Sequence, residues 1–316
     1  MLPNVIIIVG PTAIGKTAVG IDIAKLNMGE VISADSMLVY RGMDIGTAKP
    51  AKDEMQGIPH HMIDLVNPDE EFTVAMFQAR AEELIKEIAE RGKAPVVVGG
   101  TGLYIRSLTE TVSYSSFAVD WEYRKGLNDQ ANELGSGWLH SQLEKVDPVA
   151  AERIHPNDQR RIVRALEVYH FTGKPISYHW KQDQLNPATP KYHLKMYGLT
   201  LNRAKLYERI NLRVDQMLTQ GLVQEVSGLL DRGYSPELVS MKGLGYKEIA
   251  AYLRGVCSLE EAVETIKQST RRFAKRQMTW FRREQNINWI DVEQYDNSTE
   301  IAKEILSRIA GQLPDT

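Results

Sequence analysis

Continuous apolar runs alternate with amphipathic segments along the first hundred residues. Residues 5–9, 30–34 and 95–100 are short apolar runs, as in strands that are covered on both faces of a parallel sheet. Residues 17–26 and 77–88 lie between them and repeat their apolar positions at helical spacing. The order of strand and helix predicts an α/β core, a parallel sheet flanked by helices.

The pattern changes after residue 111 and returns near residue 193. Residues 112–192 carry no strand signal and are polar and aromatic, which predicts a helical insertion. Residues 196–201 then read as a late strand, and the chain beyond them is predicted to be helical to its end. We therefore expect a first part of the core over 1–111, an insertion domain over 112–192, and completion of the core with basic C-terminal helices over 193–316.

A phosphate-binding loop follows the first apolar run. It matches G-x-x-x-x-G-K-[ST], in which glycines let backbone N–H groups surround phosphate oxygens, the lysine reaches the outer phosphate, and the hydroxyl holds Mg²⁺. Its residues are Gly10, Pro11, Thr12, Ala13, Ile14, Gly15, Lys16 and Thr17. The loop predicts a P-loop NTPase-like core that handles a polyphosphate or a pyrophosphate. A glycine-rich turn that binds nothing is the alternative.

Two more polar positions are expected on the same edge of the sheet. Asp35 follows the second predicted strand, and Thr101 follows the Gly99-Gly100 turn after the third. Ligands of open α/β sheets bind beyond the carboxyl ends of the strands. The phosphate loop, Asp35 and Thr101 are therefore predicted to face one cleft.

Composition and charge narrow the class of protein. The chain has 316 residues, of which 43% are hydrophobic, so it can form a large globular core. The single Cys257 excludes a disulfide framework, and neither a leader nor a membrane span is evident, so a cytoplasmic protein is expected. Because the net charge is −3, contact with nucleic acid requires local basic patches.

Two predicted helices carry such patches. Residues 157–171 form a helix that Asn157-Asp158 can cap, with Arg160, Arg161 and Arg164 on one stripe; a solvated face with Glu167 as a local ion-pair partner is an equal alternative. A helix begins at the capping box of Ser258 and carries cations around Trp280, typical of a single-strand RNA surface, although Trp280 could instead belong to the core. These cations are Arg271, Arg272, Lys275, Arg276, Arg282 and Arg283.

The combined motifs closely resemble those of the bacterial tRNA dimethylallyltransferases. The resemblance extends over nearly the whole chain, from residue 5 to about residue 283. Its motifs are GPTAIGKT (10–17), DS (35–36), VYRGMDIGTAKP (39–50), GGTGLY (99–104), HPND (155–158), RALEV (164–168), RVD (213–215) and AKRQ (274–277). The chain departs from the family at 113–120, where the family usually has a proline-rich segment.

The resemblance implies transfer of a dimethylallyl group from dimethylallyl diphosphate to N6 of the adenosine just 3′ of a tRNA anticodon, with Mg²⁺ as cofactor. Lys16 and Arg213 would bind the departing diphosphate, and Thr17 would hold the metal. Asp35 would accept a proton from N6, with a metal ligand or a structural cap as its alternative role, and Thr101 would orient substrate, with a helix cap as its alternative role.

The resemblance also implies a path for the anticodon stem-loop, along which the target base must be extruded. The residues of that path are Asp35, Ser36, Met37, Leu38, Thr101, Arg124, Gln159, Arg160, Arg161, Ile162 and Val163. Arg271, Lys275 and Arg276 of the basic helix are expected to bind the same RNA. The protein is expected to act as a monomer.

Other interpretations of the sequence stay open. A kinase or ATPase could use the same loop, and a prenyltransferase that acts on free adenine nucleotides would need no extended RNA surface. His60, His61 and Asp64 could suggest a metal site, but adjacent strand residues point to opposite faces, so hydrogen-bonding or packing roles are expected. A group of methionines could line a prenyl pocket or fill the core: Met37, Met43, Met55, Met62 and Met76.

Overall fold

The computed structural model describes residues 2–110, 120–185 and 190–311, which form two compact units. One unit comprises residues 1–109 and 191–316, and the other comprises residues 110–190. The second unit therefore starts and ends two residues before the predicted insertion. The family-atypical segment 113–120 lies, apart from Asp120, outside the described residues.

The first unit contains a six-stranded sheet in which every pair of neighbouring strands is parallel. The strand order is β3-β2-β4-β1-β5-β6. The strands are β1 (Asn4–Val9), β2 (Gly29–Ala34), β3 (His60–His61), β4 (Ala94–Gly99), β5 (His193–Thr200) and β6 (Ile287–Asp291). The predicted parallel sheet, with its late strand, is confirmed.

The strand β6 shows that the prediction of helix throughout the C-terminal region was wrong. Its five residues pair with β5 at the edge of the sheet, where Ile287 and Ile290 are buried. Gly198 of β5 makes room for it, because a Cβ there would lie 2.7 Å from the Trp289 ring. Five residues of mixed polarity between two long helices give too short a periodic pattern to be recognised.

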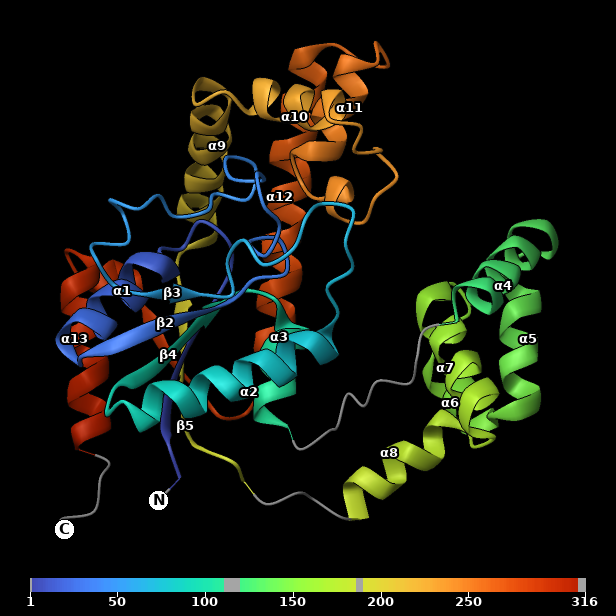
Figure 1. Ribbon diagram of the computed structural model, residues 1–316, viewed down its shortest axis with the longest axis horizontal. Helices are drawn as coiled ribbons and strands as arrows, with labels where there is room; N and C mark the ends of the chain where they lie inside the picture. The colour runs from blue at the N-terminus through green and yellow to red at the C-terminus, as the bar shows by residue number, and fades with distance from the viewer. Residues whose placement is uncertain (1, 111–119, 186–189, 312–316) are drawn as a thin grey trace. The chain divides into compact units, whose positions relative to one another are not determined.

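Helices cover both faces of this sheet (Figure 1). Along β1, Ile6 and Ile8 point into one apolar layer, and Val5, Ile7 and Val9 into the other. The first layer contains α1 (Lys16–Leu26) and α13 (Ser298–Ala310), and the second contains α2 (Val74–Glu90) and α3 (Gly102–Thr109). Burial on both sides explains why the strands are apolar without alternation.

A third apolar cluster joins the C-terminal helices to the loop after β2. Val39, Tyr40 and Met43 of that loop pack among these helices. The elements are α9 (Arg203–Thr219), α10 (Leu222–Asp231), η1 (Ser240–Lys242), α11 (Tyr246–Leu253) and α12 (Leu259–Phe281), and a further 3₁₀ turn, η2 (Val292–Gln294), follows β6. The α12 helix begins at the predicted Ser258 capping box. Its second half reaches the sheet, where Ala274 and Phe281 enter the two layers.

The second unit is helical, as predicted, and has an apolar core of its own. Its helices are α4 (Trp121–Leu134), α5 (Ser136–Val146), α6 (Pro148–Arg153), α7 (Gln159–Thr172) and α8 (Ile176–Leu185). The Asp158 side chain accepts a hydrogen bond from Arg161 N and so caps α7. None of the helices in the described ranges is both long and apolar enough to cross a lipid bilayer.

A buried carboxylate ties the edge of the sheet together. Glu30 of β2 accepts hydrogen bonds from Arg91 and Lys93 at 2.7 and 2.9 Å, and its Oε2 lies 2.7 Å from His61 Nε2. His60 Nδ1 lies 2.8 Å from Ile58 O, so both histidines have the predicted hydrogen-bonding roles. Burial opposes ionisation of Glu30, but the bonds from His61, Lys93 and Arg91 outweigh it and lower its pKa from 4.5 to about 2.

Glu30→Gln is expected to lower the free energy of unfolding by about 2 kcal/mol at pH 7, because the carboxylate ionises more readily in the folded state. A lowered folded-state pKa stabilises the protein above the unfolded value of 4.5, and this stabilisation is lost as pH falls toward 2. The difference from wild type, measured by urea unfolding, should therefore be constant above pH 6 and shrink toward pH 3. Glu90→Gln, at an exposed ion pair on α2, serves as control. A difference that does not change with pH would contradict this account.

Candidate active site

The phosphate loop connects β1 to α1 through a backbone that two glycines allow. Gly10 and Gly15 have φ angles of 148° and 101°, a region that disfavours other residues. Gly10 also lies so close to β5 that a Cβ would be 2.9 Å from Leu199 O. Lys16 Nζ donates a hydrogen bond to Pro11 O at 2.8 Å, so the lysine folds back over its own loop.

The carboxyl ends of three neighbouring strands meet beside this loop. In the sheet register, Gly99 of β4 is paired with Val9 of β1 and with Ala34 of β2. The residues that follow these strands are therefore level with one another. The structure thus brings the phosphate loop, Asp35 and Thr101 to one edge, as predicted.

Two cations and one carboxylate interact at this edge. Burial lowers the pKa of Lys16 to about 7, with the nearby Arg213 lowering it further and Asp35 opposing both effects. Burial also lowers the pKa of Arg213, against the attraction of Asp35 and Glu54. Arg213 comes from α9, far along the chain, and lies close enough to Lys16 and Asp35 to interact with both. Two half-buried cations next to a loop of backbone amides favour a dianionic or more highly charged ligand.

Asp35 and Thr101 are linked through Ser36. The Thr101 hydroxyl accepts a hydrogen bond from Ser36 N at 3.1 Å, and Thr101 N donates to Ala34 O at 3.2 Å. The Thr101 hydroxyl therefore bonds to the loop after β2. It does not cap α3, which was the alternative role. Asp35 Oδ1 accepts from Met37 N at 2.8 Å, so this oxygen does cap a turn, and no described residue hydrogen-bonds to Oδ2.

The Thr17 hydroxyl is suited to bind Mg²⁺ whose other ligands are substrate phosphates and water. Thr17 is exposed at the start of α1, and its hydroxyl makes no hydrogen bond to the described residues. Within the ranges that the structure describes, no three His, Cys, Asp or Glu side chains gather into a metal cage. Mg²⁺ bound by one protein oxygen, substrate phosphates and water needs no such cage.

The α12 helix covers the same edge of the sheet. Gln277 is buried and bonds to two loops at once: Oε1 accepts from Thr12 N, and Nε2 donates to Gly100 O, each at 2.9 Å. The Trp280 ring lies against Gly102, where a Cβ would be 2.4 Å from Nε1. The role of Gln277 was not recognised from sequence. The available signal was an amide on the otherwise apolar face of an amphipathic helix.

A basic cavity of about 400 Å³ opens beside this part of α12. Its lining consists of Arg272, Lys275, Arg276, Thr279, Trp280 and Arg283. Trp280 packs against the core, as the alternative interpretation held, and its ring also lines the cavity. Arg271 does not line this cavity: its guanidinium donates to Asn211 on α9 and to Glu264.

The insertion presents a more limited surface than expected. Arg160 and Arg161 are exposed, whereas Ile162 and Val163 are buried in the core of the insertion, so the expectation that these two side chains contact RNA was wrong. Helical periodicity turns two of five consecutive residues inward. Gln159 donates to Asn128 Oδ1 at 2.9 Å.

The buried Glu167 organises two arginines of the insertion. Arg124 and Arg164 each donate to Glu167 Oε2, at 2.9 and 2.7 Å. The local pair of Glu167 with Arg164 was the alternative interpretation of the basic stripe, and it is confirmed. Arg124 keeps 27% of its side chain exposed while holding this pair. Arg160 and Arg161 remain exposed, and Arg164 keeps 38% of its side chain exposed.

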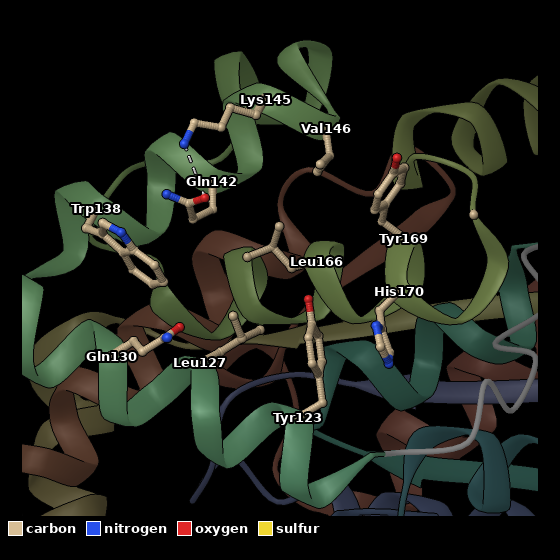
Figure 2. A pocket seen from close by; sticks show the side chains of 11 residues that line it. Tyr123, Leu127, Gln130, Trp138, Gln142, Lys145, Val146, Leu166, Tyr169 and His170 are labelled. Carbon is tan, nitrogen blue, oxygen red and sulfur yellow. Dashed lines mark hydrogen bonds between the residues drawn. The ribbon is translucent and has the colours of Figure 1, made fainter.

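A second cavity, of about 610 Å³, lies within the insertion (Figure 2). Tyr123 stacks on His170 at its edge, with ring centroids 4.1 Å apart. Trp138, Tyr169 and the amides of Gln130 and Gln142 also line it. Aromatic rings beside amides are groups on which unstacked RNA bases stack and pair. The sequence signal was only a general abundance of aromatic residues.

The five methionines do not share one environment. Ser36, Met37 and Leu38 are half-buried, and Met37 packs against Gly243. Met43 and Met62 are fully buried in two different apolar clusters, and Met76 is 45% exposed. Met43 and Met62 are core filler, as the alternative interpretation held.

Comparisons with known proteins agree with this geometry. A family model described as IPP transferase matches residues 38–284. A curated tRNA dimethylallyltransferase from Acetivibrio thermocellus is 52% identical over 304 residues, 96% of each chain. The crystal structure of a tRNA isopentenylpyrophosphate transferase from Bacillus halodurans superposes with a TM-score of 0.72 at 47% identity, covering 98% of this chain and 96% of the other. The structure of a eukaryotic dimethylallyltransferase acting on tRNA superposes with a TM-score of 0.83 at 30% identity. The match covers 99% of this chain and 81% of the other.

Proposed function

The chain belongs to the IPP transferase family, and from this membership we propose that it transfers a dimethylallyl group from dimethylallyl diphosphate to N6 of the adenosine 3′ of a tRNA anticodon. Diphosphate is released. One observation carries the proposal: Lys16 of the phosphate loop and Arg213 of α9 interact electrostatically with Asp35 at the edge where three parallel strands end together. That edge can bind a leaving diphosphate and accept a proton.

The leaving group is stabilised on the side of the phosphate loop. The C1–O bond of the allylic diphosphate breaks with its electron pair going to oxygen, so negative charge grows on the diphosphate. The Arg213 guanidinium meets that charge together with the Lys16 ammonium, whose charged form the diphosphate itself stabilises. The Thr17 hydroxyl would hold Mg²⁺, which would supply further positive charge against the leaving diphosphate. The loop therefore serves transfer of the organic group and needs no ATP hydrolysis.

The acceptor is activated on the side of Asp35. The N6 lone pair is delocalised into the purine, so attack on C1 becomes easier when a carboxylate takes an N6 proton as the new C–N bond forms. Asp35 Oδ2 is the oxygen that serves as base, since Oδ1 caps Met37 N. Thr101, linked to Ser36, orients the groups beside it.

The RNA is held by basic and aromatic groups outside the edge. A base stacked in an anticodon loop cannot reach Asp35, so it is extruded from the loop. Lys275, Arg276 and Trp280 line a cavity next to Gly102 and supply cations with a stacking surface. Arg160, Arg161 and Arg124 of the insertion contact the stem-loop. We propose that the protein acts as a monomer in the cytoplasm.

Replacing both Lys275 and Arg276 by Gln is expected to raise KM for an anticodon stem-loop about tenfold and to reduce the slope of log KM against log salt by about 1, because two phosphate contacts are lost. KM for dimethylallyl diphosphate should stay unchanged. The matched control removes two exposed lysines from the opposite part of the unit, Lys25 on α1 and Lys303 on α13. Equal effects of the two double variants would show that only overall charge matters.

An acceptor comparison tests the proposed function. Purified protein, Mg²⁺ and labelled dimethylallyl diphosphate are incubated with an unmodified anticodon stem-loop or with AMP. Transfer to the stem-loop and not to AMP supports the proposal. Transfer mainly to AMP would identify a nucleotide prenyltransferase, and consumption of ATP without transfer to either acceptor would indicate a kinase or an ATPase.

A further inference from the structure

Resting on the proposed function, we further propose that Gln277 is a positioning residue that sets the orientation of the phosphate loop and, through it, of Lys16. Gln277 touches neither substrate in this proposal. It acts through the peptide between Pro11 and Thr12 and through the turn that carries Thr101.

Gln277 holds one peptide unit of the phosphate loop. Thr12 N donates to Gln277 Oε1 at 2.9 Å, and the carbonyl of the same peptide unit, Pro11 O, accepts from Lys16 Nζ at 2.8 Å. The N–H and C=O of a trans peptide point in opposite directions within one rigid plane. Gln277 on one side therefore fixes the direction in which Pro11 O presents its lone pairs to the ammonium group on the other.

The nitrogen of the same Gln277 amide bonds to the turn before Thr101. Gln277 Nε2 donates to Gly100 O at 2.9 Å, directly before Thr101. A Cβ at Gly100 would lie 2.3 Å from this nitrogen, so the contact depends on glycine. One amide thus joins the loop at the leaving-group side to the turn at the acceptor side. A side-chain amide offers a neutral donor and a neutral acceptor on the same terminus at every pH.

The packing of α12 against the sheet fixes the position of the Gln277 amide. Gln277 is 6% exposed, and Ala274 and Phe281, one turn before and after it, are fully buried in the two apolar layers of the sheet. Figure 1 shows α12 descending to the sheet beside α3. The position of Gln277 is therefore fixed by packing. The same helix carries Lys275 and Arg276, so the helix that binds RNA also holds the phosphate loop.

The pH dependence of kcat in Gln277→Glu distinguishes a positioning role of Gln277 from a purely structural one. A protonated Glu can accept from Thr12 N and donate to Gly100 O, whereas a carboxylate has no donor and faces the Gly100 carbonyl. We expect kcat to fall about 30-fold at pH 8.5 and to return to within about threefold of wild type as pH is lowered toward 6, because burial raises the pKa of the introduced carboxyl. Lys16, Asp35, Arg213, Lys275 and Arg276 are present in both proteins, so the introduced carboxyl is the only ionisable group by which the two profiles differ.

Two further variants keep the test decisive. Gln277→Leu should lower kcat about 30-fold at every pH, with KM for the stem-loop within about twofold of wild type, and Gln268→Glu, at an exposed position of the same helix, should change neither. Thermal unfolding is recorded for each protein at each pH. A Gln277→Leu variant with wild-type kcat, or a loss of rate in Gln277→Glu that follows the unfolded fraction or does not recover at low pH, would overturn the proposal.

Binding of inorganic diphosphate with Mg²⁺ separates this proposal from the proposed function. Because Gln277 sets the loop itself, Gln277→Leu should weaken diphosphate binding about tenfold by calorimetry, whether or not a prenyl group is ever transferred. Wild-type affinity in that variant would overturn the role of Gln277. Absence of transfer by the wild-type enzyme, with weaker binding in the variant, would instead count against the proposed function alone.

Discussion

Lys16→Met is expected to lower kcat with dimethylallyl diphosphate and a stem-loop about 10³-fold, the largest effect of any single substitution proposed for this chain. Methionine retains most of the volume of lysine but removes the charge that meets the departing diphosphate. Lys16 is also the group whose own position depends on Pro11 O, 2.8 Å away. Single-turnover rates with saturating RNA measure the effect on chemistry directly.

The control for Lys16 lies on the same helix. Lys25 of α1 is exposed at the far end of that helix, and Lys25→Met should leave the single-turnover rate within about twofold of wild type. A rate for Lys16→Met within tenfold of wild type would mean that Arg213, Mg²⁺ and backbone amides suffice for the leaving group. The assignment of Lys16 would then be wrong.

Asp35→Asn is expected to lower kcat about 10²-fold while diphosphate binding in the presence of Mg²⁺ stays nearly intact. Asn is the informative replacement, because its Oδ1 can still accept from Met37 N and preserve the turn after β2. What it removes is the ability to accept an N6 proton. Binding is measured by calorimetry with inorganic diphosphate, and the rate by single turnover.

The alternative role of Asp35 predicts the reverse pattern. A carboxylate that binds metal would lose affinity for diphosphate on conversion to Asn, and raising the Mg²⁺ concentration would restore the rate. Asp53→Asn, at an exposed carboxylate in the loop between β2 and β3, should alter neither quantity. Rescue of Asp35→Asn by Mg²⁺ would therefore replace the base with a metal ligand.

The parts of the fold that were predicted correctly have strong local patterns. The strands β1 and β4 are apolar on both faces, and the phosphate loop is fixed by glycines and a lysine at set spacing. The common edge for Asp35 and Thr101 followed from the rule that parallel strands end together. The assignment of Arg213 to the diphosphate has no such local signal and rests on the family resemblance.

The errors and omissions arise where tertiary context decides. The strand β6 exists because Gly198 leaves room for Trp289, a contact between segments far apart in the sequence. Ile162 and Val163 belong to a family segment assigned to RNA, yet the turn of α7 places them in the core. Gln277 looked like one polar residue on an apolar face, and its function depends on Thr12 and Gly100, 265 and 177 residues away.

The central claim is the chemical identity of the product, and nucleoside analysis of the reacted RNA tests it most directly. Two stem-loops are compared that differ only in the residue 3′ of the anticodon, adenosine in one and guanosine in the other, each digested and analysed by mass spectrometry after incubation with dimethylallyl diphosphate and Mg²⁺. The account predicts N6-dimethylallyladenosine from the first RNA alone, with one diphosphate released per nucleoside formed. The same modified nucleoside from both RNAs, or diphosphate released with no modified nucleoside from either, would contradict it.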